Sequence, residues 1–391
     1  NWQSVFGGPA WTWDARRGQY YFHNFLREQP DLNFHNPEVQ DAALATAKFW
    51  LDRGVDGFRL DALNFSMHDL QLRDNPPAPD TGKPRTRSFD FQLHTYNQSH
   101  ADIPRFLERI RALTDSYGGK FTVAEVGGAE PEGEMHAFTQ GEGRLNSAYG
   151  FNFLYAKKLT PALVRDAVAE WPAEQGTGWP SWAFENHDAP RAVSRWVDDA
   201  HRAAFARMKM LLLLSLRGNA FLFQGEELGL TQVEIGFEHL QDPEAIANWP
   251  LTLSRDGART PMPWVADAPV AGFTTGRPWL PLGPDHAALA VDRQDADPDS
   301  LLNLTRRLVA LRLASPALMM GNMEIVEAGE ALLVFEREGE GQTMICAFNL
   351  GAEPLAWAPQ DAHRFRVAAA VNGATPTALP PYSGVILERV A

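Results

Sequence analysis

The chain has 391 residues, 45% hydrophobic and 21% charged, which is an ordinary globular composition. Its net charge of −14 disfavours nucleic acid and anionic membranes as partners, whereas a neutral sugar is indifferent to that charge. The longest apolar stretch, around Met208 to Leu216, is too short to span a bilayer. Cys346 is the only cysteine, so an internal disulfide is excluded and a reducing, cytoplasmic location is expected.

The N-terminal residues 1–33 are rich in aromatics, Gly and Pro without a clear period, which predicts a loop-rich segment. From Pro37, apolar residues recur at helical spacing as far as Gly54, and a short buried strand is predicted at 55–60. Helical and strand patterns then alternate, which is typical of a parallel α/β sheet with crossover helices. The further helices are predicted at 103–117, 163–171, 202–216 and 299–313, and the further strands at 121–126, 148–154, 182–185 and 220–224.

The pattern changes after Gly321, where apolar segments alternate or run between turns. These segments, at 331–337, 343–350 and 384–390, predict a small antiparallel β domain.

Acidic residues follow three of the predicted parallel strands. Asp61 follows the first strand, Glu125 lies at the end of the second, and His187 and Asp188 follow the third. Arg59 lies two residues before Asp61, so both side chains point the same way and the arginine can keep the aspartate ionised. Such a pair is also common as a purely structural element. Acidic residues at separate strand ends, however, suit glycosidic cleavage with retention, in which one carboxylate attacks and one carboxylic acid protonates the leaving oxygen.

Four motifs carry a family resemblance: QPDLN (29–33), GFRLDALNF (57–65), QGEELG (224–229) and RDGARTPMPW (255–264). With them the chain resembles glycoside hydrolase family 13, the α-amylase superfamily, in its oligo-1,6-glucosidase and α-glucosidase branch. The resemblance implies a (β/α)8 TIM-type barrel, of which this chain holds strands four to eight and strands one to three would lie before Asn1. It divides the chain into the end of an inserted loop-rich subdomain (1–33), the C-terminal part of the barrel (34–320) and a C-terminal β-sandwich domain (321–391).

The resemblance also implies roles for individual residues. Asp61 would be the nucleophile with Arg59 as its partner, Glu125 the general acid and base, and Asp188 a third catalytic carboxylate. The substrate-binding residues would be His187, Arg255, Phe6 and Phe25. Without the resemblance, these residues have plainer structural interpretations. Glu125 would be a structural residue beside a turn, His187 a core histidine and Asp188 a helix cap. Arg255 would be a surface arginine, and Phe6 and Phe25 would be core aromatics.

No cofactor and no metal ligand are expected in this chain, although the early loop that often holds calcium or magnesium would lie before Asn1. The expected partner is a small oligosaccharide or glucoside, and the expected assembly is a monomer or homodimer. Asn64-Phe65 stands where polymer-cleaving amylases tend to have Lys-His, which favours an exo enzyme.

The resulting prediction is a retaining exo-α-glucosidase that also transfers glucose. Ala62, where a valine accompanies α-1,6 preference in this branch, indicates an α-1,4 preference. The alternatives are a sucrose hydrolase or isomerase, a trehalose synthase, or a non-catalytic scaffold like the transporter heavy chains.

Overall fold

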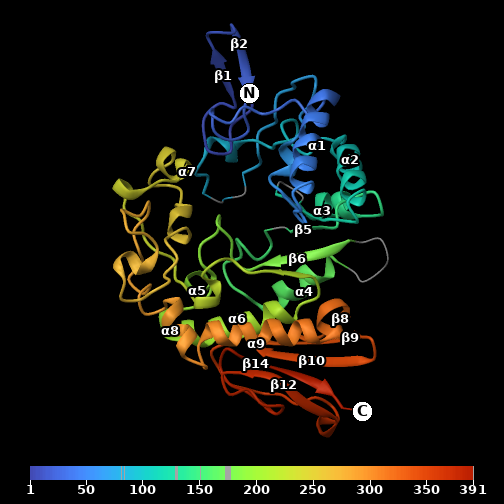
Figure 1. The fold of residues 1–391 in the computed structure, drawn as a ribbon, viewed down its shortest axis with the longest axis vertical. Coiled ribbons are helices and arrows are strands. Elements are labelled where there is room, and N and C mark those ends of the chain that lie inside the picture. Colours follow the sequence, from blue (N-terminus) through green and yellow to red (C-terminus); the bar gives the residue numbers. More distant parts are fainter. Residues whose placement is uncertain (81, 83, 128–130, 150, 172–177, 391) are drawn as a thin grey trace. The chain divides into compact units, whose positions relative to one another are not determined.

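The structure is a computed structural model that describes residues 1–80, 82, 84–127, 131–149, 151–171 and 178–390. It divides into two compact units, which are described separately (Figure 1). The first unit comprises Asn1–Gly150, Glu174–Trp179 and Asp242–Ser254. The second comprises Phe151–Ala173, Pro180–Gln241 and Arg255–Ala391.

The first unit begins with an antiparallel hairpin of β1 (Trp11–Asp14) and β2 (Gln19–Phe22). Trp2, Ala10 and Phe22 form a small buried cluster next to this hairpin. The Trp2 and Phe22 rings meet edge to face with centroids 5.1 Å apart. The segment predicted to be loop-rich therefore contains a hairpin. Its strands are short and rich in aromatic residues, so they show no alternation that a sequence pattern could reveal.

Three parallel strands form the centre of the first unit: β3 (Gly57–Leu60), β4 (Phe121–Glu125) and β5 (Ser147–Tyr149), paired in that order. Helix α1 (Pro37–Leu51) precedes β3, and its first turn is capped by the Asn36 side chain. Helix α2 (Ile103–Asp115) precedes β4 and buries one apolar stripe. The strand predicted at 148–154 is wrong in extent, because residues 151–155 form turns and residue 150 lies outside the described residues.

The second unit contains two more parallel strands, β6 (Trp179–Ala183) and β7 (Asn219–Phe221). Between them lies helix α6 (Arg202–Ser215), whose residues from Met208 to Ser215 are all buried. Helix α9 (Leu301–Ala314) packs against α6 (Figure 1). The shorter helices of the two units are α3 (Pro131–Thr139), α4 (Pro161–Ala169), α5 (Ala192–Arg195), α7 (Pro243–Ala247), α8 (Val291–Ala296) and α10 (Pro316–Met320).

The C-terminal part of the second unit is an antiparallel sheet in the order β12-β14-β10-β9-β8, which confirms the predicted β domain (Figure 1). A two-stranded sheet of β11 and β13 accompanies it. Arg337 of β9 is fully buried and donates to the carbonyl oxygens of Ser215 and Gly321, which joins the sheet to the end of α6. The strands are β8 (Asn322–Ala328), β9 (Leu332–Gly339), β10 (Gln342–Asn349), β11 (Leu355–Ala356), β12 (Phe365–Val371), β13 (Ala378–Leu379) and β14 (Ser383–Arg389).

The described residues thus supply five parallel strands in two groups, where a closed (β/α)8 barrel has eight. Over the same residues, no helix has the length and apolar character that crossing a bilayer demands.

Gly57 is the residue of β3 at which the backbone of β4 comes closest. A Cβ atom at this position would overlap the carbonyl oxygen of Phe121, its partner in the ladder. We expect Gly57→Ala to destabilise the protein by about 3 kcal/mol or more, because a strand must move to make room. Gly133→Ala is the control, since its Cβ meets nothing within 4 Å on helix α3. Equal melting temperatures for the two variants would contradict the close approach.

Candidate active site

Arg59 is the centre of a group of polar side chains at the carboxyl ends of β3, β4 and β5. Its Nη1 pairs with Asp61, and its Nη2 lies 2.7 Å from Oε2 of Glu125 and 3.0 Å from the Tyr149 hydroxyl. The Asp61 side chain is 72% exposed, whereas that of Glu125 is only 10% exposed. Three of the predicted site residues therefore lie together, with the guanidinium contacting both carboxyl groups.

The two carboxyl groups have different environments. Burial raises the pKa of Glu125 to about 7, the Arg59 charge opposes this shift, and the hydrogen bond and charge of Asp61 add to it. The Ala62 amide also faces Glu125, 3.4 Å from Oε2. Glu125 thus keeps its proton near neutral pH, while exposed Asp61 is paired with a permanent cation. A neutral acid beside a paired carboxylate is the combination that general acid catalysis with a nucleophile requires.

Tyr149 is a site residue that the sequence analysis missed. Its hydroxyl donates to Oε1 of Glu125 at 3.1 Å and accepts from Arg59. Burial raises the pKa of Tyr149, so its hydroxyl remains a donor. The only available signal was its place near the start of the strand predicted at 148–154, and many core aromatics share such a position.

The predicted aromatic residues Phe6 and Phe25 contact each other in the first unit, with ring centroids 5.6 Å apart. Phe25 also lines a largely apolar cavity of about 500 Å³, together with Asp61 and Ala62. Glu125 and Tyr149 are not in its lining, so this cavity alone is not a complete substrate pocket.

Asp31 of the QPDLN motif has a structural explanation. Its Oδ2 accepts hydrogen bonds from the backbone and side-chain amides of Asn24, at 2.9 and 2.8 Å. Asn24 is itself fully buried and precedes Phe25 directly. Burial raises the pKa of Asp31 to about 6. Asp31 therefore fixes the turn that presents Phe25.

The other predicted site residues form a second group in the second unit, after β6. Asp188 is contacted by three side chains: His187 at 3.2 Å, Arg255 at 3.2 Å and Arg259 at 2.7 Å. Arg259 also donates to the His187 carbonyl oxygen, and the Asn186 side chain accepts from the Asp188 amide. The predicted trio of His187, Asp188 and Arg255 is therefore assembled, and Arg259 is an additional member that the sequence analysis missed.

A buried ionic network lies behind this second group. Lys209 of α6 is fully buried between Glu185, at 2.9 Å, and Glu226, at 2.6 Å. Arg191 pairs with Glu185 at 3.1 Å and donates to the carbonyl oxygens of Gln224 and Ala258. The three motifs around residues 185–191, 224–229 and 255–264 are thereby joined by charge-assisted hydrogen bonds. Glu185, Arg191, Lys209 and Glu226 were not predicted to have a role.

A carboxyl pair of unequal protonation at the ends of parallel strands is typical of glycoside hydrolases. The family profile described as "Alpha amylase, catalytic domain" matches residues 1–321, and this chain belongs to the α-amylase family. The chain is 44% identical over 367 residues to a "Probable alpha-glucosidase" of Rhizobium meliloti (strain 1021), covering 90% of this chain and 65% of the relative. It is 31% identical over 356 residues to an "Oligo-1,6-glucosidase" of Parageobacillus thermoglucosidasius, covering 83% of this chain and 62% of the relative.

Among solved structures, the chain is similar to an "alpha-glucosyl transfer enzyme, XgtA" with a TM-score of 0.91 and 45% sequence identity. This similarity covers 100% of the chain and 74% of XgtA. The chain thus spans a little under two thirds of the length of the two curated relatives.

The buried network gives a prediction for stability. Lys209→Met would leave Glu185 and Glu226 facing each other without their shared cation, which is expected to cost about 3–5 kcal/mol. The matched control is Lys48→Met, which removes a solvent-exposed pair with Asp52 and should leave the melting temperature nearly unchanged. Thermal melting of both variants is the measurement. A Lys209 variant as stable as the Lys48 variant would contradict the network.

The pKa of Glu125 predicts a pH-dependent effect. The folded chain holds this proton up to about pH 7, whereas an unfolded glutamate releases it near 4.5. The stability that Glu125 contributes is therefore full below about pH 4.5 and is lost as the pH rises through about 7. Glutamine does not titrate. The free energy of unfolding of Glu125→Gln, taken relative to the wild type, should therefore rise by up to about 3 kcal/mol between pH 5 and pH 8.

Melting temperatures of both proteins across this pH range measure the effect, with Glu330→Gln as a surface control for the loss of one charge. If the melting temperatures of the Glu125 variant and the wild type differ by the same amount at pH 5 and at pH 8, Glu125 is not held protonated.

Proposed function

We propose that this chain carries the catalytic groups of a retaining exo-α-glucosidase that acts on short α-glucosides and also transfers glucose to acceptor sugars. The observation that carries the proposal is the contact of one arginine, Arg59, with both Asp61 and Glu125. The charge of Asp61 also raises the pKa of Glu125. Retaining enzymes place their carboxyl groups about 5–5.5 Å apart, whereas inverting enzymes separate them by about 6.5–9.5 Å to admit a water.

The proposed reaction has two steps. Asp61 attacks the anomeric carbon while Glu125 gives its proton to the departing glycosidic oxygen, which leaves a glucosyl ester on Asp61. Glu125, now a carboxylate, then takes a proton from water or from an acceptor hydroxyl, whose oxygen attacks the anomeric carbon and releases Asp61. Arg59 stabilises the ionised form of each carboxyl group in turn, and Tyr149 holds the orientation of Glu125.

His187, Asp188 and Arg255 are proposed to bind the hydroxyl groups of the transferred glucose. In support, two arginines contact the Asp188 carboxyl group, whose remaining acceptor positions suit hydrogen bonds from sugar hydroxyls. Phe25 and Phe6 are proposed as an aromatic wall of the glucose pocket. Because the relatives are longer than this chain, we infer that the five parallel strands are strands four to eight of a (β/α)8 barrel. Similarity to a glucosyl transfer enzyme supports the transfer activity.

The test of this proposal compares two variants on two substrates. Asp61→Asn should reduce kcat by about 10⁴-fold or more on both maltose and glucosyl fluoride, because an amide cannot form the ester. Glu125→Gln should lose about 10²–10⁴-fold on maltose and far less on the fluoride, which leaves without protonation. A non-catalytic scaffold would show no turnover in the wild type. Equal losses for Glu125→Gln on both substrates would contradict its role as the acid.

Ala62 is proposed to set the linkage preference by bordering the acceptor sugar. The residue has a left-handed backbone, with φ 42° and ψ 41°. A valine there would be strained, because β-branched residues rarely adopt this conformation. Ala62→Val should shift the ratio of kcat/KM for maltose over isomaltose toward isomaltose by roughly ten- to two-hundredfold.

Ala62→Gly removes the strain of the left-handed backbone and makes more room for the acceptor sugar. It should therefore keep or increase the preference for maltose. Taking the ratio of the two substrates removes any general loss of folded protein. A ratio that is unchanged in both variants would remove Ala62 from linkage selection.

A further inference from the structure

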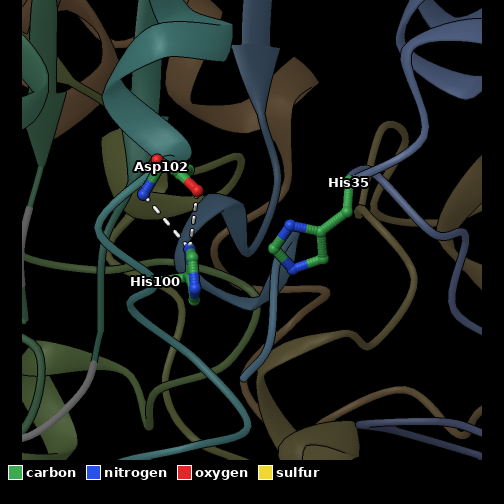
Figure 2. A group of neighbouring side chains, drawn as sticks. All are labelled: His35, His100 and Asp102. Carbon is green, nitrogen blue, oxygen red and sulfur yellow. Dashed lines mark hydrogen bonds and ion pairs between the residues drawn. The ribbon is translucent and has the colours of Figure 1, made fainter. Parts of the chain in front are cut away.

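A cluster of two histidines and an aspartate lies in the first unit, at the start of two helices. His35 lies just before α1, and His100 and Asp102 lie in the segment that leads into α2. One potential ligand atom from each of the three residues lies within 4.8 Å of the other two. Figure 2 shows the nitrogen-bearing edge of the His35 ring turned toward His100 and Asp102.

The hydrogen bonds indicate an unprotonated nitrogen on each ring. His35 Nε2 lies 2.7 Å from the His68 carbonyl oxygen, which can only accept, so this nitrogen carries the proton and Nδ1 keeps its lone pair. His100 Nδ1 accepts from the Asp102 amide at 3.2 Å and lies 3.7 Å from Asp102 Oδ2, so it is also unprotonated (Figure 2). Its single lone pair is used by the Asp102 amide, so a metal at Nδ1 would replace this hydrogen bond. A carbonyl that fixes the second nitrogen of a histidine is a usual support for metal-binding imidazoles.

We propose that His35, His100 and Asp102 form a binding site for a divalent transition metal of the zinc class. Two neutral imidazoles and one carboxylate are a zinc-type ligand set, and water would complete the coordination. Mg²⁺ and Ca²⁺ prefer oxygen ligands alone, so they fit this donor set poorly.

Metal binding requires a small contraction of the cluster. Zinc–ligand bonds of about 2.0–2.1 Å place tetrahedral ligand atoms roughly 3.3 Å apart. The separation between His100 and Asp102 is already close to this value, and no separation within the cluster must shorten by more than about 1.5 Å. The Asp102 side chain can adjust, because it is 44% exposed and its pair with Arg105, at 3.3 Å, is open to solvent.

The ion would act as a structural support rather than a reactant. It would join the start of α1 to the start of α2, two elements that flank β3 in the sequence. The same segment is already tied to the loop after Asp61, because the Ser99 amide donates to the Asn64 carbonyl oxygen at 2.6 Å. The Asn64 side chain in turn donates to the carbonyl oxygen of Gly127, after β4. We therefore expect zinc to raise the melting temperature.

The experiment titrates ZnCl₂ into the untagged protein by calorimetry and repeats thermal melting with zinc and with EDTA. The wild type should bind one equivalent and melt higher with zinc. His35→Gln, His100→Gln and Asp102→Asn should each weaken zinc binding by at least about tenfold and lose the thermal shift. His363→Gln, which removes an exposed histidine of the C-terminal region, should behave as the wild type.

The proposal fails if the wild type binds no zinc, or if the three variants bind zinc as tightly as it does. Circular dichroism and melting in EDTA identify a variant that has lost its fold, in which case the other two decide. A thousandfold excess of Mg²⁺ should not displace the zinc, and displacement would overturn the assignment of metal class.

Discussion

The contact of Arg59 with Asp61 and Glu125 is the constraint on which the candidate site depends. Two neighbouring carboxyl groups disfavour each other's ionisation unless a cation lies beside them, and a cation contacting both groups does not by itself distinguish them. The distinction comes from exposure. Asp61 projects beyond β3 into solvent, whereas Glu125 is the last residue of a strand that is buried after its first residue. One guanidinium and an asymmetry of burial therefore give two carboxyl groups two different chemical properties.

In the second unit, buried charged residues hold the loops around Asp188 in place. Lys209, Glu185, Arg191 and Glu226 form a network from which water is almost excluded. Such networks seldom add net stability over a well-packed apolar core, but removing one member is costly. The backbone carbonyl oxygens of Gln224 and Ala258 are held by Arg191 of the same network. The network therefore fixes the relative positions of three loops, and two of these loops carry Asp188, Arg255 and Arg259.

Membership of the α-amylase family and the activity of this chain rest on different evidence. The profile match and the similarity to curated relatives establish the family. The activity is inferred from the contacts of Arg59, and the related proteins include both glucosidases and a glucosyl transfer enzyme. Hydrolysis and transfer share one covalent intermediate and differ in the acceptor that reaches it. Residues that are proposed to border the acceptor, such as Ala62, are therefore the ones to compare.

The sequence by itself determined the parallel α/β pattern, the antiparallel C-terminal sheet and the contact between Arg59 and Asp61. Each of these follows from local periodicity or from the alternation of side chains along one strand. The tertiary structure alone decided the rest. Tyr149, Arg259 and Lys209 reach their partners across 17 to 90 residues of sequence, and no local pattern distinguishes them from core or surface residues. The hairpin β1–β2 was missed because its strands are too short to show a period. His35 and His100 meet only because two helices begin side by side, a consequence of packing that residue spacing cannot reveal.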